Sequence, residues 1–474
     1  MLDTIVVIDT FRYLYKIDSV YKFGDFREVY RVRSNIVFRE LSNRIVVSIR
    51  GLEDKQNEIY LENIKLNSPI WGFFYTNVLP LNLISNSQVF LNDYRISLEF
   101  SKIRELGVLL GSYGKSSIFL NYGNFGIERT YNENNFKYWD SFNREYFRKN
   151  NFEDKLGGYV NYKDYKLIFY SAKFGMPLRG YGNEGNDFER VRGFLSSHKK
   201  FYFSYQFYQY NHEKPYESYS LSLKYFESIV VSMKKIHQRH ILKVPIKNLV
   251  NISLVYDEGI FRYDYNFSKT FDLWSFTLDL SIKRRLPNFS ELYYSSNYAK
   301  GDKFLNPENF YSASISYLFI NTFITYIQNP ILWLPENEYW IAKNEKYLLL
   351  YGIELNGKFR FLNISASYIE NKLSKNRVLP YRPKLNLSAK VIYNFSEFLR
   401  DEIAFVFYST RPRYYYPSSE KLKPILIIDY YKFFDFKSFF VYLYFKNLLN
   451  KSYEFIAGYP MESFSINIKG GVRW

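Results

Sequence analysis

The sequence predicts an all-β transmembrane protein, an antiparallel outer-membrane β-barrel of about 22 strands with a small N-terminal α/β plug domain in its lumen. Three observations predict this class. Many segments alternate apolar and polar residues with a period of two, and the connections between them alternate between short and long. Aromatic residues make up 21% of the 474 residues, yet no apolar run approaches the roughly 18 residues that a transmembrane helix needs. The sequence therefore excludes a helical membrane protein.

The last segment shows the alternation clearly. Between Phe464 and Trp474, even positions carry apolar residues or glycine, and odd positions carry polar residues or glycine. Such a strand has one face for lipid and one for a wet lumen, and a C-terminal aromatic residue suits the last strand of an outer-membrane barrel. Residues 362–368 and 385–393 alternate in the same way. The strands of a soluble β-sandwich also alternate apolar and polar residues, so the lengths of the connections must distinguish the two folds.

From about Arg104 onward, tight links and long loops take turns. The tight links include residues 163–164, 198–200, 227–228 and 320–321. The long connections are 132–153, 175–187, 284–309, 329–346, 371–382, 410–423 and 447–463. Short turns at one rim and long loops at the other are the layout of a transmembrane barrel. A sandwich or a propeller has no reason to alternate in this way.

Composition excludes several functions. The formal charge is +17, but Lys and Arg are scattered between aromatic residues and follow no recognition motif, so we expect no nucleic-acid partner. The chain has no cysteine, which removes disulfide and thiolate chemistry. Nothing resembles a nucleophile triad, a phosphate loop or a pair of acid and base carboxylates. We therefore expect a protein that is not an enzyme, with no catalytic residue, no resident cofactor and no metal site.

The domain order follows from the width of the barrel. Side chains cannot fill the lumen of a barrel of about 22 strands, so another part of the chain must close it. We expect a short N-terminal segment at residues 1–10, a plug at 11–104 and the barrel at 105–474. Met1 to Thr4 have neither a basic region nor an apolar core, so no signal peptide is evident. Either this is the mature form with an added Met, or the start was assigned too late.

Several segments together resemble the TonB-dependent outer-membrane transporters over nearly the whole chain. Asp3, Thr4, Ile5, Val6 and Val7 resemble the TonB box of that family. The other segments that resemble the family, in the same order, are 48–51 (Ser-Ile-Arg-Gly), 59–69, 79–81 (Leu-Pro-Leu), 285–293, 306–308 (Asn-Pro-Glu), 352–354 (Gly-Ile-Glu), 447–453, 458–460 and the terminal Trp474.

The resemblance implies partners and a location. Asp3 to Val7 would bind the periplasmic protein TonB by strand addition. The C-terminal strand would engage the barrel assembly machinery, and the barrel would contact outer-membrane lipid. The chain would be a monomer in the outer membrane of a Gram-negative-type bacterium, with its long loops extracellular. Its ligand would be a metal chelate or a corrinoid.

The plug departs from the family pattern. It is about 20 residues shorter after Leu79 to Leu81. Leu91 stands where the family has an arginine, and Ser312 stands where the family has the matching glutamate. Losing both partners avoids a buried unpaired charge. The resemblance implies that Arg50 and Glu354 form the single plug–barrel docking pair that is left.

Candidate ligand contacts lie at the apex of the plug and in the outer loops. They are Asn67, Ser68, Pro69, Trp71, Trp333, Trp340, Tyr414, Tyr415 and Tyr416. Each aromatic residue among them could instead belong to an aromatic girdle or to loop packing. His237 and His240, expected in a short outer loop, could bind haem iron or a metal, although an incidental pair is the more common case.

The function expected from these features is TonB-dependent transport of a scarce bulky solute, namely a ferric siderophore, cobalamin or haem. Two alternatives stay open. A shortened plug could leave a passive or gated channel, and long loops could serve a surface-binding or adhesion barrel.

Overall fold

The structure is a computed structural model, and it describes residues 14–17, 20–22, 26–30, 33–41, 44–139, 144–177, 186–199, 201–246, 250–336, 338–415 and 420–474. The predicted TonB box at Asp3 to Val7 and the candidate contact Tyr416 lie outside these ranges.

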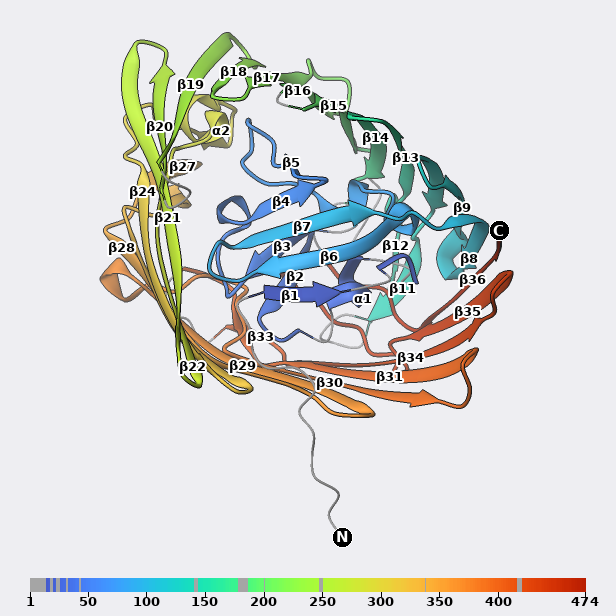
Figure 1. Ribbon diagram of the computed structural model, residues 1–474. Helices are drawn as coiled ribbons and strands as arrows, with labels where there is room; N and C mark the ends of the chain where they lie inside the picture. The colour runs from blue at the N-terminus through green and yellow to red at the C-terminus, as the bar shows by residue number, and fades with distance from the viewer. Residues whose placement is uncertain are drawn as a thin grey trace.

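A closed antiparallel barrel of 22 strands forms most of the molecule (Figure 1). Each strand pairs with its neighbours, and the last strand closes the barrel by pairing with the first, Ile468 opposite Leu110. The strands are β8 (Arg104–Gly111), β9 (Lys115–Tyr122), β10 (Phe125–Asn132), β13 (Glu153–Tyr162), β14 (Tyr165–Gly175), β15 (Phe188–His198), β16 (Phe201–Tyr210), β17 (Tyr216–Leu223), β18 (Phe226–Ser232), β19 (Ile236–Ile246), β20 (Val250–Asp257), β21 (Ile260–Leu273), β22 (Phe276–Arg285), β24 (Glu308–Tyr317), β25 (Ile320–Gln328), β28 (Tyr347–Lys358), β29 (Leu362–Leu373), β30 (Leu385–Asn394), β31 (Leu399–Tyr408), β34 (Ile425–Asp435), β35 (Phe439–Lys446) and β36 (Ser465–Arg473). The fold class predicted from the sequence is therefore confirmed.

Burial along these strands is the reverse of that in a soluble protein. In β36, the polar residues Asn467 and Lys469 are buried, whereas Ile466 and Ile468 are 37% and 49% exposed. The period of two places the polar set in the lumen and the apolar set outside. Closure also removes every unpaired strand edge, which lipid could not satisfy. The barrel therefore presents an apolar wall to its surroundings.

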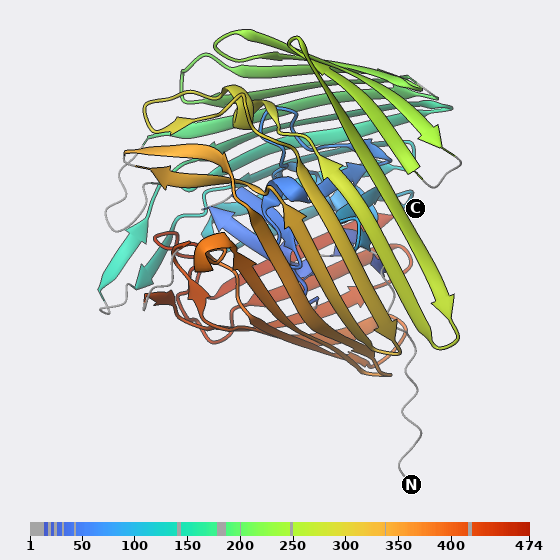
Figure 2. The same ribbon diagram turned by 90° about the vertical axis from the view of Figure 1, so that its left-hand side faces the viewer.

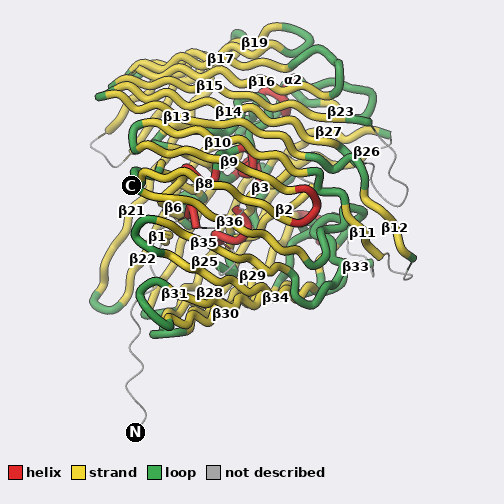
Figure 3. The backbone as a smooth tube through the Cα atoms, turned by 90° about the vertical axis from the view of Figure 1, so that its right-hand side faces the viewer, coloured by secondary structure: helices red, strands yellow, loops and turns green. Residues whose placement is uncertain are grey.

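Long connections leave the barrel at one rim and short turns lie at the other (Figures 2 and 3). The long connections carry β11 (Phe136–Trp139), β12 (Glu145–Arg148), α2 (Phe289–Tyr293), β23 (Ala299–Lys300), β26 (Ile331–Glu336), β27 (Tyr339–Asn344), η6 (Ser374–Asn376), β32 (Arg411–Pro412) and β33 (Lys421–Leu422), whereas η5 (Ser112–Gly114) is the short link between β8 and β9. Two predicted turns are displaced. They lie at 224–225 and 318–319, not at 227–228 and 320–321. The second turn is displaced because Leu318 adopts positive φ and the alternation continues through Ile320.

The N-terminal residues fill the lumen (Figure 1). Their elements are β1 (Leu14–Ile17), η1 (Val20–Lys22), α1 (Phe26–Tyr30), β2 (Ile36–Leu41), β3 (Arg44–Ile49), η2 (Asp54–Gln56), β4 (Glu58–Leu61), β5 (Ile64–Lys65), η3 (Thr76–Val78), η4 (Leu81–Leu83), β6 (Ile84–Phe90) and β7 (Arg95–Phe100). A five-stranded sheet in the order β1-β6-β7-β4-β5 forms their centre, and β2 pairs with β3. We call residues 14–100 the plug.

The plug and the lumen wall share one apolar core. Buried plug residues such as Leu83 and Phe100 belong to the same cluster as the lumen-facing Tyr159 and Tyr442. The rings of Phe100 and Tyr159 stack with centroids 3.9 Å apart. Aromatic rings bury large areas and so suit a wide interface between two β-structures. Within the described ranges, the structure has no helix that is long and apolar enough to cross a membrane.

Candidate functional site

Arg50 and Glu354 form a buried ion pair between the plug and β28. The Arg50 Nε donates to Glu354 Oε1 at 3.0 Å, and Nη2 donates to Oε2 at 2.7 Å. Both side chains are almost fully buried, and Asn92 accepts from the remaining guanidinium nitrogen at 2.9 Å. The guanidinium also lies 4.2 Å from the centroid of the Phe323 ring. The two residues that the sequence comparison paired are thus joined by two hydrogen bonds in the structure.

The pair of Arg50 and Glu354 is one of several ion pairs that the plug forms, which corrects the expectation of a single docking pair. Further plug–barrel or plug–loop ion pairs join Arg44 to Glu189, Lys55 to Glu291, Glu53 to Arg382, Glu58 to Lys283, Glu62 to Lys166, Glu28 to Lys446 and Lys22 to Asp435. No sequence motif indicated these pairs, because each joins residues more than 100 positions apart. The short plug is therefore held at many points around the lumen.

Neutral groups occupy the position of the missing second pair. The hydroxyl of Tyr94 lies 3.1 Å from Ser312 Oγ and 2.6 Å from Thr325 Oγ1, and Leu91 is fully buried. The buried Leu91 and the hydroxyl of Ser312 carry no charge, so neither position leaves an unpaired charge in the interface.

An aromatic cavity lies between the plug and the long loops. Its lining includes Trp71 from the plug, Trp333 and Trp340 from β26 and β27, and Tyr415 from the loop after β32, so the structure brings four of the predicted contacts together. It encloses about 1150 Å³ of empty space, part of it open to solvent. Sequence reasoning missed the other rings of the lining, which are Phe73, Tyr75, Tyr208 and Tyr294. We call this space the aromatic cavity.

Trp71 stands at the centre of a ring cluster. Its indole lies edge-on to Tyr208, Tyr216 and Tyr294, with centroids 5.2, 5.6 and 5.4 Å away. Tyr294 in turn contacts Trp333 at 6.4 Å. Edge-to-face rings at these separations attract each other beyond the area they bury. Tyr294 follows the motif at 285–293 directly, a signal that could have identified it; Tyr208 comes from a distant strand that no motif marks.

Charged groups beneath the cavity are compensated. Glu53 pairs with Arg382 at 3.0 Å, and Asp54 pairs with Arg39 at 3.2 Å. Lys55 pairs with Glu291 at 2.7 Å. Burial alone would raise the pKa of Glu291, but Arg285 and Lys55 outweigh it and lower that pKa to about 2. The floor of the cavity is thus a network of paired charges under a lining of rings.

The plug hairpin at 66–73 is bonded to the outer loop that carries α2. The amides of Phe289 and Ser290 donate to the carbonyls of Pro69 and Ile70, at 3.3 and 2.8 Å. Asn288 caps α2 by accepting from the Glu291 amide and also donates to the Trp71 carbonyl at 3.0 Å. A Cβ on Gly72 would lie 2.5 Å from the Asn288 Nδ2. Only glycine permits this close approach of hairpin and loop.

Two of the predicted ligand contacts form hydrogen bonds with the backbone of the plug hairpin. Asn67 is buried, and its amide group bonds the backbone of Ile59, Asn57 and Gly72. Ser68 Oγ accepts from the amides of Ile70 and Trp71. These two polar side chains therefore shape the hairpin that presents Trp71, and neither Pro69 nor Tyr414 lines the aromatic cavity. Tyr414 is exposed and donates to Glu420 at 3.3 Å.

His237 and His240 lie on β19 and not in a loop, which corrects their predicted place. His237 faces the lumen side, where it lies 2.5 Å from Glu258 Oε1 and stacks on Tyr293. His240 faces the other side and stacks between Phe226 and Tyr256. Residues three apart on a strand point to opposite faces, so the two rings cannot share an ion. Among the described residues, no group of three or more His, Asp or Glu side chains is placed to hold a metal.

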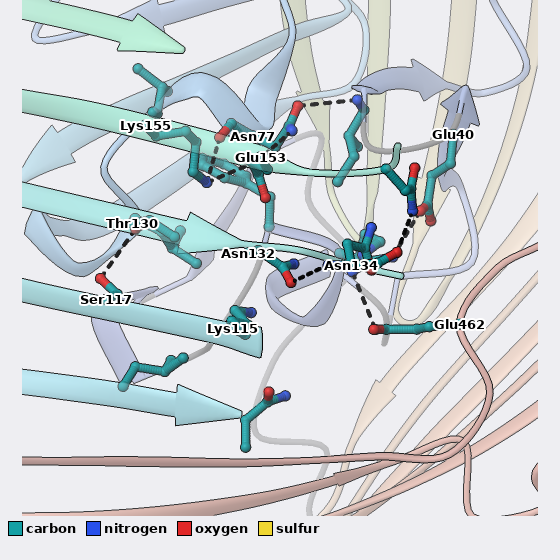
Figure 4. Close-up of a pocket in the computed structure, with 18 of the residues that line it drawn as sticks. Glu40, Asn77, Lys115, Ser117, Thr130, Asn132, Asn134, Glu153, Lys155 and Glu462 are labelled. Carbon is teal, nitrogen blue, oxygen red and sulfur yellow. Dashed lines mark hydrogen bonds and ion pairs between the residues drawn. The ribbon is translucent and has the colours of Figure 1, made fainter. Parts of the chain in front are cut away.

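A second space, of about 930 Å³, lies between the plug and β9, β10 and β13 (Figure 4). Its lining is polar. Asn77 donates to Glu153 at 2.9 Å, Lys155 donates to the Asn77 carbonyl at 2.8 Å, and Thr130 donates to Ser117 at 3.1 Å. These groups are engaged with one another across the plug–barrel interface. The space is therefore a polar part of that interface.

A third space, of about 1540 Å³, separates the plug from β16 to β22. Glu58 crosses it from the plug, pairing with Lys65 at 2.9 Å and with Lys283 of β22 at 3.0 Å. Burial would raise the pKa of Glu58, but the two lysines outweigh it and hold that pKa well below its usual value. We call this space the lateral passage.

Comparison with known proteins shows where the fold occurs. No protein-family model and no curated protein sequence matches the chain. Among solved structures, the ferric enterobactin receptor PfeA from Pseudomonas aeruginosa aligns with 99% of this chain and all of its own, at 11% identity and a TM-score of 0.65. The FrpB iron transporter from Neisseria meningitidis aligns at 12% identity and 0.64, covering 98% and 99% of the two chains. The copper transporter OprC aligns at 10% identity and 0.63, covering 99% of each.

These similarities extend over nearly the full length of both chains and show a shared fold. The matched proteins are receptors and transporters and not enzymes.

Proposed function

We propose that this chain, which shares the fold of the outer-membrane receptors above, is a TonB-dependent transporter of a scarce bulky solute, a ferric siderophore, cobalamin or haem. The observation that carries the proposal is the aromatic cavity, which lies between the long loops and the apex of a plug that fills a closed barrel. In this setting the long loops face outside and the cavity is the first enclosed space that a solute meets.

The chemistry of the cavity favours a bulky chelate over a bare ion. Its walls are rings from Trp71, Trp333, Trp340, Tyr294 and Tyr415, and ring faces bind apolar or planar surfaces. No metal-binding cluster occurs among the described residues. The indole N–H of Trp71 is buried and has no hydrogen-bond partner in the described part of the chain. An unmet donor costs roughly 1 to 3 kcal/mol, which a ligand acceptor would recover.

The hairpin offers a route from the cavity to the plug. A ligand that displaces Trp71 acts on a segment whose carbonyls at Pro69, Ile70 and Trp71 are bonded to the loop around α2. The remaining partners that we propose are TonB, through Asp3 to Val7, and the barrel assembly machinery, through β36. The chain would act as a monomer, because one barrel holds one plug and one cavity.

A binding assay tests the proposal. The purified protein in detergent is titrated with ferric siderophores, cobalamin and haemin while its tryptophan fluorescence is followed. We expect quenching by one of these classes with a dissociation constant in the micromolar range or below, and energy-dependent uptake of that solute in cells with TonB. Failure of all classes to bind would contradict the proposal.

The lateral passage favours a second candidate function, a gated channel. Glu58, Lys65 and Lys283 bridge this space between plug and wall. In planar bilayers, Glu58→Gln should raise conductance if the ion pairs close the passage, whereas Glu420→Gln, which affects an exposed loop pair, should not. Solute flux without TonB would favour the channel over active transport.

A further inference from the structure

We propose that the outer wall of β10 to β15 carries a binding site for a phosphorylated lipid headgroup of the outer leaflet. The site consists of Lys173, Arg190 and Arg192, with Arg129 beside it, and we call these four residues the basic patch. It rests on the membrane setting proposed above and is independent of transport.

The orientation of these residues follows from their neighbours. Glu128, Ala172, Phe174, Glu189 and Val191 alternate with the members of the basic patch along β10, β14 and β15. Glu128 bonds Asn82 of the plug, Glu189 pairs with Arg44 of the plug, and Phe174 contacts Tyr75 of the plug, so this set faces the lumen. Because side chains alternate along a strand, the four cations point outward.

Like charges meet within the basic patch. Lys173 on β14 lies directly opposite Arg190 on β15, and Arg192 lies opposite Ser171 two positions away. Lys173 and Arg190 share the ring of Phe188, with centroid distances of 4.4 and 4.8 Å. Like charges that face each other across two strands destabilise a sheet. An anion bound between them would turn this cost into attraction.

The nearby carboxylates that the structure describes do not form ion pairs with Lys173, Arg190 or Arg192. Asp154 lies beside Lys173 but pairs with Arg129 at 2.6 Å. Glu217, further round on β17, accepts from the Tyr205 hydroxyl at 2.7 Å. Within the described ranges, Lys173, Arg190 and Arg192 form no ion pair. The basic patch therefore keeps three cations on one face of the barrel for an outside anion.

Position selects a lipid headgroup as that anion. Lys173 is the third residue from the end of β14, and Arg190 and Arg192 are the third and fifth residues of β15, so all three lie beside the long connection at 176–187. Below them on the same face, Phe194 is exposed to the apolar surroundings. Cations just above an apolar aromatic band meet the level of lipid phosphates. The cations also stand on adjacent strands about 4.8 Å apart, which suits a single headgroup.

Lipid binding can be measured without TonB or a transported solute. The protein is purified in a neutral detergent, and native mass spectrometry counts the bound molecules of lipid A that carries two phosphates. The test variant combines Lys173→Gln, Arg190→Gln and Arg192→Gln. The matched control combines Arg284→Gln, Lys372→Gln and Lys384→Gln, which also removes three positive charges from the outer wall or its rim.

We expect one lipid A per wild-type barrel, about 100-fold weaker binding by the test variant, since each cation near a lipid surface contributes about a fivefold factor, and no change in the control. Equal loss in both variants would overturn the proposal, because general surface charge would then explain binding. Equal binding of dephosphorylated lipid A, or binding of inorganic phosphate as tight as that of the lipid, would also overturn it. Failure of solute uptake would leave this result unaffected.

Discussion

Arg50 and Glu354 meet through two parallel hydrogen bonds, 2.7 and 3.0 Å long, across the boundary between plug and barrel. A fork-to-fork contact of this kind fixes geometry as well as charge. Both groups are out of water, so each depends on the other. Removing one partner leaves a buried charge without compensation, whereas removing both leaves none.

We expect Arg50→Ala or Glu354→Ala to weaken plug docking by about 3 to 5 kcal/mol, and the double variant to weaken it less than either. Leak conductance in planar bilayers should follow the same order. The exposed pair Arg413 and Glu420 is the matched control, because surface ion pairs contribute roughly 0 to 1 kcal/mol. Silent single variants would show that the other plug ion pairs suffice.

Removal of the N-terminal segment separates binding from transport. We expect a chain that lacks Asp3 to Val7 to bind its solute with unchanged affinity, because the lining of the aromatic cavity begins at Glu53. Energy-dependent uptake should be lost, since the segment that we propose to pair with TonB would be absent. A variant in which Asp3 to Val7 are replaced by five glycine and serine residues keeps the length of the chain and should lose uptake in the same way. Uptake that survives the deletion would favour the channel.

The sequence could predict what depends on local periodicity. Alternation and loop length indicated the barrel, and the predicted long connections 132–153 and 329–346 end within one residue of the observed strand ends. A motif also indicated Arg50 and Glu354, because both lie in short segments with a fixed order. These features need only neighbouring residues to be read.

The aromatic cavity could be predicted only in part, because it is built from distant segments. Trp71, Trp333, Trp340 and Tyr415 were found because tryptophan and tyrosine stand out in loops. Tyr208 comes from a strand in which most residues are aromatic, so no contrast marked it. Asn67 could not be assigned from the sequence, because a polar residue at a hairpin apex suits a ligand and a backbone contact equally well. The structure shows the backbone contacts of its amide, and its contact with a ligand stays a prediction.

Acid should loosen the contact between Glu291 and the plug. The pKa of Glu291 in the folded protein is about 2, below the roughly 4.3 of an unfolded chain. Its contribution of about 3 kcal/mol is therefore present above pH 4.3 and is lost as the pH falls toward 2. Hydrogen exchange of the Phe289 and Ser290 amides, corrected for intrinsic rates, reports this contact. We expect Glu291→Gln to exchange faster at pH 7 and to approach the wild type near pH 2. A constant difference at all pH values would contradict the assignment.

The last prediction concerns Trp71. Its ring contacts Tyr208, Tyr216 and Tyr294 and lines the aromatic cavity, so Trp71→Ala should weaken solute binding by about 2 kcal/mol or more, roughly 30-fold. Trp71→Phe should restore part of the affinity, because it keeps a ring but loses the unmet indole donor. Trp274→Ala is the matched control, since Trp274 is fully exposed at a short turn on the opposite rim. Equal affinities of Trp71→Ala and Trp274→Ala would place the solute outside the aromatic cavity.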